Sequence, residues 1–228
     1  MFITIEGVEG SGKTSHILPL ARFLTEKGYK VFTTREPGGT GISEQIRSIL
    51  HNMDNTEMHP RTETLLYQAA RAQVVEQVIR PKLKEGYIVL CDRYVHSTIA
   101  YQGYGHKQDL TQINGLIEYA VNGLKPDMVL LLDLDAKIGL DRKFGTGEWN
   151  RLDSYSLTFH KRVRDGYINM LNVDPLKWRI INAQNKWEMV QDELQKHTTL
   201  LMEHIGFQED IFHSPGYPLH ESQIPASD

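Results

Sequence analysis

The segment Gly7-Val8-Glu9-Gly10-Ser11-Gly12-Lys13-Thr14 constrains the fold of this chain more than any other feature. It matches G-x-x-x-x-G-K-[ST] at each fixed position, with a short apolar run before it and helical apolar spacing after it. Such a turn directs backbone N–H groups at one point, at the positive end of a helix. We expect this loop to bind ATP, with Lys13 reaching the β- and γ-phosphates and Thr14 ligating Mg2+. The flanking strand and helix patterns argue against a chance match.

The rest of the chain alternates apolar, β-branched runs with longer segments of helical spacing. Several runs are nearly continuous, which is typical of strands buried on both faces of a parallel sheet. This alternation predicts an α/β fold, a doubly wound domain with a five-stranded parallel sheet flanked by helices. The five runs are Phe2–Ile5, Lys30–Thr33, Tyr87–Cys91, Met128–Leu132 and Trp178–Ile181.

Several apolar stripes predict the buried faces of helices between these strands. A long helix is expected to begin near Pro60 and to kink at Pro81, because proline suits a first turn and disrupts a helix interior. Pro19 predicts a bend in the helix after the phosphate loop. The stripes are Ile42, Ile46, Ile49 and Leu50, then Leu65, Leu66, Ala69, Ala72, Val75 and Ile79, then Ile113, Leu116, Ile117 and Ala120, and finally Met189, Leu194, Leu200 and Leu201.

The domain organisation predicted from these patterns is a single domain over residues 1–206, with a lid at about 142–153. Residues 207–228 form a turn-rich C-terminal extension, for which we expect mobility. Apolar residues in the extension, such as Phe207 and Phe212, leave open that part of it docks on the domain or on a partner.

Composition limits the partners and the compartment. A formal charge of −4 gives no electrostatic case for nucleic acid binding. The single cysteine, Cys91, excludes an intrachain disulfide and fits a reducing compartment. No stretch approaches the roughly 20 apolar residues of a membrane span, and no signal segment precedes the first strand pattern. We therefore expect a soluble, cytoplasmic protein without membrane association.

Charged residues follow two of the predicted strands at the edge where open α/β sheets bind ligands. Arg35 follows the second strand, and Asp92 and Arg93 follow the third. An acidic residue in this place suits Mg2+ or its waters, and an arginine fork can bridge two phosphate groups. Each arginine taken alone could equally form a surface ion pair. Their common position beside a phosphate loop favours a second phosphate site.

The segment from Asp141 to Asp153 carries basic residues on both sides of a Gly145-Thr146-Gly147 hinge. Such a segment can close over a phosphoryl group, bring cations to it and exclude water. A merely solvated basic loop is the alternative. The lid is favoured because the phosphate loop has no arginine of its own, so cations for the transferred group must come from elsewhere.

In this order the motifs resemble those of the thymidylate kinase family, nucleoside monophosphate kinases that convert dTMP and ATP to dTDP and ADP. The resemblance extends from Phe2 to about Ile205 and implies the fold of P-loop nucleoside monophosphate kinases. Its landmarks are Glu6 to Thr14, Arg35-Glu36-Pro37-Gly38-Gly39-Thr40, Leu65-Leu66-Tyr67-Gln68-Ala69-Ala70-Arg71, Asp92-Arg93-Tyr94, Ser97 to Gln102, and Pro126-Asp127.

For catalysis and phosphate binding, the resemblance implies that Lys13 and Thr14 hold the ATP phosphates and Mg2+, with Asp92 as the acidic partner of the metal. Glu9 would lie near the sugar hydroxyl of dTMP. Arg35 would grip the dTMP phosphate, and Arg93 would bridge donor and acceptor. Lid cations, in a bacterial-type arrangement, would be Arg142, Lys143 and Arg151, although the lid has fewer arginines than that pattern. Which of them reaches the transferred phosphoryl group stays open.

For the nucleosides, the resemblance implies a stack of Tyr67, where phenylalanine is usual, on the thymine, and a hydrogen bond from Arg71 to the base carbonyl. Ser97, Tyr101 and Gln102 would line the sugar and the base edge. Ala183, in the loop after the fifth strand, would accommodate adenine. Family members usually form homodimers, and the apolar helix faces between Leu65 and Ile79 leave room for one.

Three other functions are compatible with parts of the sequence. The chain could be another nucleoside or nucleoside monophosphate kinase, a nucleotide-dependent switch or ATPase, or an inactive nucleotide-binding module. The last is disfavoured because the phosphate-binding residues are all present. No histidine or cysteine nucleophile is needed, so we expect the ten histidines to be structural or exposed. We also expect strong rejection of purines but weaker discrimination between dTMP and dUMP, because sensing one methyl group is worth about 1–3 kcal/mol.

Overall fold

The computed structural model describes residues 1–145 and 149–205. Within them, one parallel sheet has the strand order β2-β3-β1-β4-β5. Each strand lies at a predicted apolar run and ends one or two residues beyond it, on a polar residue. The sheet therefore presents polar groups along its carboxyl edge. The strands are β1 (Phe2–Glu6), β2 (Val31–Arg35), β3 (Ile88–Asp92), β4 (Met128–Asp133) and β5 (Trp178–Asn182).

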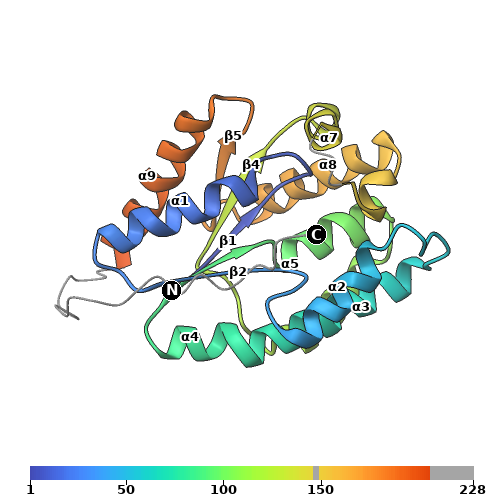
Figure 1. Ribbon diagram of the computed structural model, residues 1–228, viewed down its shortest axis with the longest axis horizontal. Helices are drawn as coiled ribbons and strands as arrows, with labels where there is room; N and C mark the ends of the chain where they lie inside the picture. The colour runs from blue at the N-terminus through green and yellow to red at the C-terminus, as the bar shows by residue number, and fades with distance from the viewer. Residues whose placement is uncertain (146–148, 206–228) are drawn as a thin grey trace.

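Helices cover both faces of this sheet, so the predicted α/β fold is confirmed. Figure 1 shows α1 and α9 on one side of the strands and α3 and α4 on the other. The α-helices are α1 (Lys13–Glu26), α2 (Gly41–His51), α3 (Pro60–Val74), α4 (Arg80–Lys84), α5 (Val95–Thr98), α6 (Leu110–Val121), α7 (Ala136–Phe144), α8 (Leu157–Val173) and α9 (Trp187–Ile205). Two π-helical segments, η1 (Val75–Ile79) and η2 (Ile99–Gly105), and a 3₁₀ turn, η3 (Arg151–Ser154), complete the described chain.

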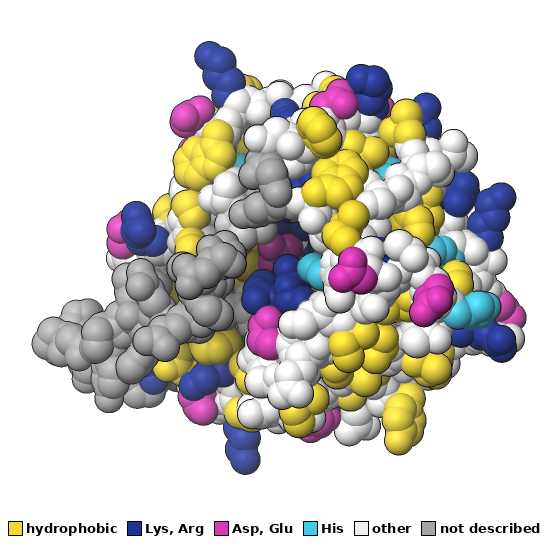
Figure 2. Space-filling view, turned by 45° about the vertical axis from the view of Figure 1, so that its right-hand side comes forward, with side chains coloured by type: hydrophobic (Ala, Val, Ile, Leu, Met, Phe, Trp, Pro, Cys, Tyr) yellow, Lys and Arg dark blue, Asp and Glu magenta, His cyan; other side chains and the backbone are white. Residues whose placement is uncertain are grey.

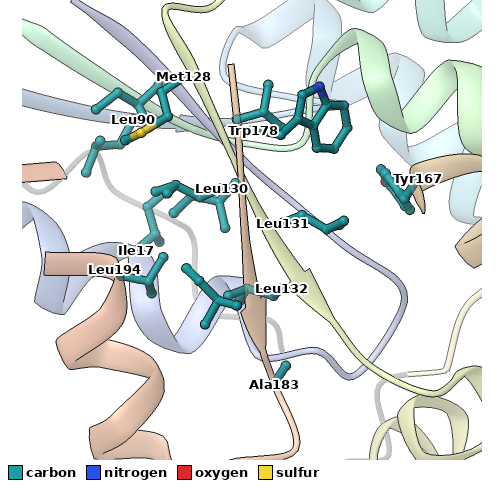
Figure 3. Packing of buried hydrophobic residues seen from close by; sticks show 14 of the residues in the cluster. Ile17, Leu90, Met128, Leu130, Leu131, Leu132, Tyr167, Trp178, Ala183 and Leu194 are labelled. Atoms are coloured by element: carbon teal, nitrogen blue, oxygen red, sulfur yellow. The ribbon is translucent and has the colours of Figure 1, made fainter. Parts of the chain in front are cut away.

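The core follows from the two-residue period of the buried strands. Figure 3 shows Leu130 and Leu132 of β4 pointing toward Ile17 of α1 and Leu194 of α9, whereas Leu131 points toward Tyr167 of α8. Both faces of the central strands are thus apolar, because helices bury both. This explains why the strand sequences are continuous rather than alternating.

The long helix predicted from Pro60 onward is divided into three parts. It begins at Pro60, as expected, and runs as α3 to Val74. The π-helical segment η1 follows, and α4 then begins with Pro81 in its first turn. The wider π-helical hydrogen-bond pattern accommodates a proline that donates no backbone hydrogen bond. By contrast, α1 continues through Pro19 as one helix from Lys13 to Glu26.

The buried face of α2 matches the predicted apolar stripe at Leu50 but not at Ile42 and Ile49. Ser43 and Leu50 are buried, whereas Ile42 and Ile49 are about half exposed, at 53% and 47%. The hydroxyl of Ser43 donates to the carbonyl of Ala70 in α3, so a small polar residue makes the close helix contact. Apolar periodicity found a face of this helix, but not the face that packs on α3.

The stripe predicted for the last helix is correct at Leu194 but not at Met189 and Leu200. Val190, Leu194 and Met202 of α9 are buried, but Met189 and Leu200 are half exposed. The predicted hinge residues Thr146 and Gly147 and the extension 207–228 lie outside the described residues. No helix in the described part of the chain has the length and apolar character needed to cross a membrane.

Candidate active site

The phosphate loop connects β1 to α1 through backbone conformations that favour glycine. Gly10 and Gly12 have φ angles of 66° and 91°. A Cβ atom on Gly10 would lie 2.1 Å from the carbonyl oxygen of Gly139 in α7. The loop therefore depends on glycine here, both for its turn and for its close approach to α7. It ends at the N-terminus of α1, where unpaired backbone N–H groups favour an anion.

Lys13 lies inside this loop. Its Nζ atom donates to the carbonyl oxygens of Gly7 at 3.0 Å and Val8 at 2.8 Å, and to the hydroxyl of Ser11 at 3.2 Å. Burial, followed by the positive charge of Arg93, lowers the pKa of Lys13 to about 8. The ammonium group is held only by neutral oxygens, and a phosphate would supply the opposite charge that this buried cation needs.

Thr14 and Asp92 form a pair of oxygen ligands beside the loop. The Thr14 hydroxyl donates to Oδ2 of Asp92 at 3.0 Å, and Oδ1 of Asp92 is buried without a hydrogen-bond partner. A hydroxyl next to an unpartnered carboxylate oxygen fits Mg2+, a hard cation that prefers oxygen. Among residues 1–145 and 149–205 there is no cluster of three or more His, Cys, Asp and Glu side chains for a metal. The donor set therefore suits an ion that retains waters and binds substrate phosphates.

Arg93 forms hydrogen bonds with both the phosphate loop and α5. It follows β3 in the left-handed region, at φ 69°, and its guanidinium donates to the Gly7 carbonyl at 3.0 Å and the Ser97 hydroxyl at 3.3 Å. It also pairs with Glu9 at 3.1 Å, and Glu9 accepts from the Tyr101 hydroxyl. Burial would raise the pKa of Glu9, but the charge of Arg93 and the nearby imidazole of His160, whose Nδ1 lies 3.5 Å from Glu9, hold it below its usual range. Glu9 is therefore a carboxylate.

Two further arginines converge on one backbone carbonyl. Arg35, the last residue of β2, and Arg47 of α2 each donate from Nη1 to the Pro37 oxygen at 3.0 Å. Arg35 also pairs with Glu44 at 3.1 Å. Burial and the charge of Arg35 lower the pKa of Arg47 to about 10. A second cluster of positive charge thus lines the same cleft as the phosphate loop.

Arg71 occupies the wall next to these arginines and is almost fully buried, with 1% of its surface exposed. Its Nε donates to Glu36 at 2.7 Å, its Nη1 to Gln68 and Thr98 at 2.9 Å each, and its Nη2 to the Tyr94 carbonyl at 3.0 Å. A guanidinium has five N–H donors, so one on Nη2 remains for a ligand.

These groups line a single cleft with a volume of about 720 Å³, within the range of small-molecule sites. Figure 2 shows it as a hollow with Lys and Arg side chains on its floor and acidic side chains beside them. Most of the predicted site residues line it. They are Glu9, Gly10, Gly12, Lys13, Thr14, Arg35, Tyr67, Arg71, Asp92, Arg93, Ser97, Tyr101, Gln102 and Arg142.

Comparison with known proteins agrees with this geometry. A sequence model of the family described as Thymidylate kinase matches residues 5–194. The chain is 46% identical to a thymidylate kinase of Exiguobacterium sp. over 209 residues, covering 92% of this chain and 99% of the relative. It is 45% identical to one of Roseiflexus castenholzii over 207 residues, covering 85% and 90%. The chain belongs to the thymidylate kinase family. A crystal structure of the thymidylate kinase from Ehrlichia chaffeensis has a TM-score of 0.70 and 32% identity, covering 87% of this chain and 98% of that one.

Membership of the thymidylate kinase family places the chain among the nucleoside monophosphate kinases, which are transferases. It also confirms the predicted fold, a parallel five-stranded sheet flanked by helices. Each part of the cleft can then be compared with the roles that the sequence motifs suggested.

Arg151 is the predicted site residue whose position differs most from expectation. It is 6% exposed and does not line the cleft. Its Nε donates to the Leu50 carbonyl at 2.9 Å, its Nη1 to the Tyr155 hydroxyl at 2.7 Å, and its Nη2 to Glu63. In this thymidylate kinase family member, Arg151 thus joins the base of the lid segment to α2 and α3. Its guanidinium is therefore bound by protein groups and lies outside the lining of the cleft.

Two other predicted site residues, Arg142 beside the lid and Ala183 after β5, contact each other. Arg142 of α7 donates to the carbonyl oxygen of Ala183, the loop residue expected near adenine, at 3.0 Å. Arg142 and Lys143 line the cleft, whereas Ala183 is buried behind it. Gly7 and Ser11 also lie outside the lining, but both accept hydrogen bonds from Lys13.

Sequence reasoning missed Arg47 and Glu63. The signal for Arg47 was its helical spacing from Ser43 and Leu50, which places all three on the buried face of α2. That face was assigned to the isoleucines instead. Glu63 had no local signal, because its partners lie 39 or more residues away in the sequence.

Proposed function

We propose that this chain phosphorylates dTMP to dTDP with MgATP as the phosphoryl donor. The observation that carries this proposal is one cleft with two separate cationic phosphate sites, the Lys13 loop and the Arg35 and Arg47 pair, with Arg93 nearby. A nucleotide switch or an ATPase needs only the first site. The second site, next to Tyr67 and Arg71, supports a phosphorylated acceptor with a base.

On the donor side, the backbone of the phosphate loop and Lys13 would hold the ATP phosphates. Thr14 and Asp92 would hold Mg2+, which when bound neutralises negative charge on the phosphates. Arg142 would cover the nucleotide near Ala183. Closure of the lid would exclude water, which a kinase requires so that it does not hydrolyse its donor.

On the acceptor side, Arg35 would bind the dTMP phosphate, and we add Arg47 to this role. The aromatic ring of Tyr67 would stack on the base, an interaction worth about 1–3 kcal/mol that tolerates any base. The one available N–H of Arg71 would donate to a base carbonyl. Glu9, Ser97 and Tyr101 would line the sugar.

The chemistry needs little besides positioning and charge. An oxygen of the dTMP phosphate attacks the γ-phosphorus, a new P–O bond forms, and the bond to the leaving ADP breaks in line with it. The acceptor oxygen is already anionic, so no general base is required. Arg93, which lines the same cleft as both proposed phosphate sites, would stabilise the charge spread over the transferred group. For Arg151 we propose a structural role in place of the expected catalytic one.

A panel of acceptors tests this function. We expect kcat/KM for dTMP to exceed that for AMP and GMP by roughly 10⁴-fold, and that for dUMP by a smaller factor of about 10- to 200-fold. The measurement is ADP release in a coupled assay with dTMP, dUMP, dCMP, AMP, GMP and thymidine. A faster rate with thymidine or AMP would contradict the proposal. Slow ATP hydrolysis that dTMP does not change would favour a switch or regulatory ATPase.

We also propose a homodimer formed through α2 and α3. Ile42, Ile49 and Leu65 are 47–55% exposed on these two helices, which pack on each other. Figure 2 shows hydrophobic side chains gathered below the hollow. Contiguous exposed apolar surface of this kind marks association sites.

Leu65→Lys should dissociate this dimer, because it would bury a charge in the interface. Sedimentation velocity at micromolar concentration should show a dimer for the wild type and a monomer for L65K. Leu176→Lys is the matched control, since Leu176 is 85% exposed between α8 and β5, and it should stay dimeric. A monomeric wild type or a dimeric L65K would contradict the proposal.

We place the enzyme in the cytoplasm, without nucleic acid or membrane partners. The free, buried thiol of Cys91 suits a reducing compartment. The net charge of −4 offers no attraction for nucleic acid.

A further inference from the structure

Glu63 is a buried carboxylate that binds four side chains from two segments of the chain, residues 102–106 and 151–155. It lies in the first turn of α3 with its side chain 0% exposed. Oε1 accepts from Nε2 of Gln102 at 2.8 Å and from Nε2 of His106 at 3.0 Å. Oε2 accepts from Arg151 and from the Tyr155 hydroxyl at 3.2 Å. Each oxygen of Glu63 therefore has two donors.

These partners keep Glu63 ionised. Burial would raise the pKa of Glu63, but the hydrogen bond and charge of His106, the hydrogen bond from Gln102 and the charge of Arg151 lower it to about 2. At neutral pH the group is a carboxylate, which can only accept hydrogen bonds. The group that faces it from each neighbour must then be a donor.

This requirement fixes the orientation of the Gln102 amide. An amide side chain has an NH2 group and a carbonyl oxygen that can exchange places by rotation. Only the NH2 group can face the carboxylate of Glu63, so the amide oxygen Oε1 of Gln102 must lie on the side of the amide away from Glu63. Gln102 is 1% exposed and lines the cleft with Tyr67 and Thr98. One N–H of the amide is used by Glu63, and the carbonyl oxygen on the other branch can accept a hydrogen bond from a ligand.

Arg71 and Gln102 together define a pattern of one donor and one acceptor. Arg71 has one N–H left for a ligand, and Gln102 has its amide oxygen. Thymine and uracil have an O4 acceptor next to an N3–H donor, which complements this pair. Cytosine has an N4 amino donor next to an unprotonated N3, so both contacts would be mismatched.

We propose that Glu63 is a positioning residue for base selection, which holds Gln102 so that the cleft accepts pyrimidines with a protonated N3 and rejects cytosine. This inference rests on the proposed function, and it adds a cause for the choice of base. Glu63 itself does not line the cleft and acts through Gln102.

Glu63→Gln tests the inference. A glutamine at 63 offers either an oxygen or an NH2 group, so the Gln102 amide can turn and show its donor to the base. We expect the ratio of kcat/KM for dTMP to that for dCMP to fall about 10- to 100-fold. The loss should come mainly from a higher KM for dTMP. The dTMP to dUMP ratio should stay the same, because the methyl group does not contact this pair.

Tyr155→Phe is the matched control. It removes another donor to Glu63, but it leaves the contact between Glu63 and Gln102 in place. The dTMP to dCMP ratio should then equal that of the wild type. Glu63→Asp is a second variant for the case that E63Q does not fold. It keeps a charge opposite Arg151 but withdraws the carboxylate from Gln102, and it too should lower the ratio.

The outcomes separate this inference from the proposed function. A wild type that prefers dTMP, with a folded E63Q or E63D that keeps the wild-type ratio, would overturn the inference alone. A fall of the same size in Y155F would also overturn it, since the effect would then reflect general loosening. A wild type that prefers another acceptor would refute the proposed function, and the inference with it.

Discussion

Replacing Lys13 by alanine should lower kcat by about 10²- to 10⁴-fold, because the proposed phosphate site loses its buried cation. Lys13 is 6% exposed, and its three hydrogen-bond acceptors are all neutral oxygens of the loop. Steady-state ADP release at saturating dTMP and MgATP measures the effect. Lys137→Ala is the control, since this exposed lysine of α7 pairs only with Asp141 and should be replaceable with little change. Near-normal turnover in K13A would refute the role of Lys13.

The dependence of kcat/KM on pH distinguishes the loss of the positive charge of Lys13 from the loss of its side-chain volume. The pKa of Lys13 is lowered to about 8, so its protonated fraction falls as the pH rises through 8. The kcat/KM for MgATP reports the free enzyme and should therefore decline above this pH. In Lys13→Arg, the side chain stays charged and this decline should be absent, whatever the absolute rate. An identical decline in K13R would assign it to another group.

The strands and the motifs on them were predictable from the sequence because their causes are local. A strand buried on both faces needs a continuous apolar run, and the five runs located β1 to β5 to within two residues. Each run stops where the chain reaches the carboxyl edge and becomes polar. That local change placed Arg35 and Asp92 at the site before any tertiary contact was known.

The helices were less predictable, because an apolar stripe does not show what covers it. In α2 the predicted stripe included Ile42, Ile49 and Leu50, yet of these three Leu50 alone is buried, together with Ser43. Ser43 allows the close approach of α3, which apolar periodicity cannot detect. The same error hid Arg47, which shares the buried face.

The contacts that organise the site across the chain could not be predicted from one sequence. Arg151 looked like a lid cation because basic residues near a glycine hinge often are. Its actual partner, Glu63, is 88 residues away in the sequence. An arginine and a buried carboxylate that are distant in the sequence form an ion pair when the fold brings them into contact. One sequence does not show which such pairs the fold brings together.

Replacing Arg93 by alanine should lower kcat on the order of 10³-fold. In the structure its guanidinium holds Glu9, the Ser97 hydroxyl and the Gly7 carbonyl at once. The variant thus loses a cation near the transferred group, and it also leaves Glu9 without its ion-pair partner. Single-turnover rates with dTMP would measure the chemical step. The melting temperature of the variant would show whether the fold survives.

Arg80→Ala controls for the loss of an arginine in a comparable setting. Arg80 pairs with Glu76 at 2.9 Å and donates to two backbone carbonyls, but it does not line the cleft. Its replacement should leave kcat within a few-fold of the wild type. Arg93→Lys keeps the charge without the planar fork, so it should recover only part of the loss. If R93K restored full activity, the positive charge alone would be sufficient. The planar guanidinium of Arg93 would then not be needed to bridge the donor and acceptor phosphates.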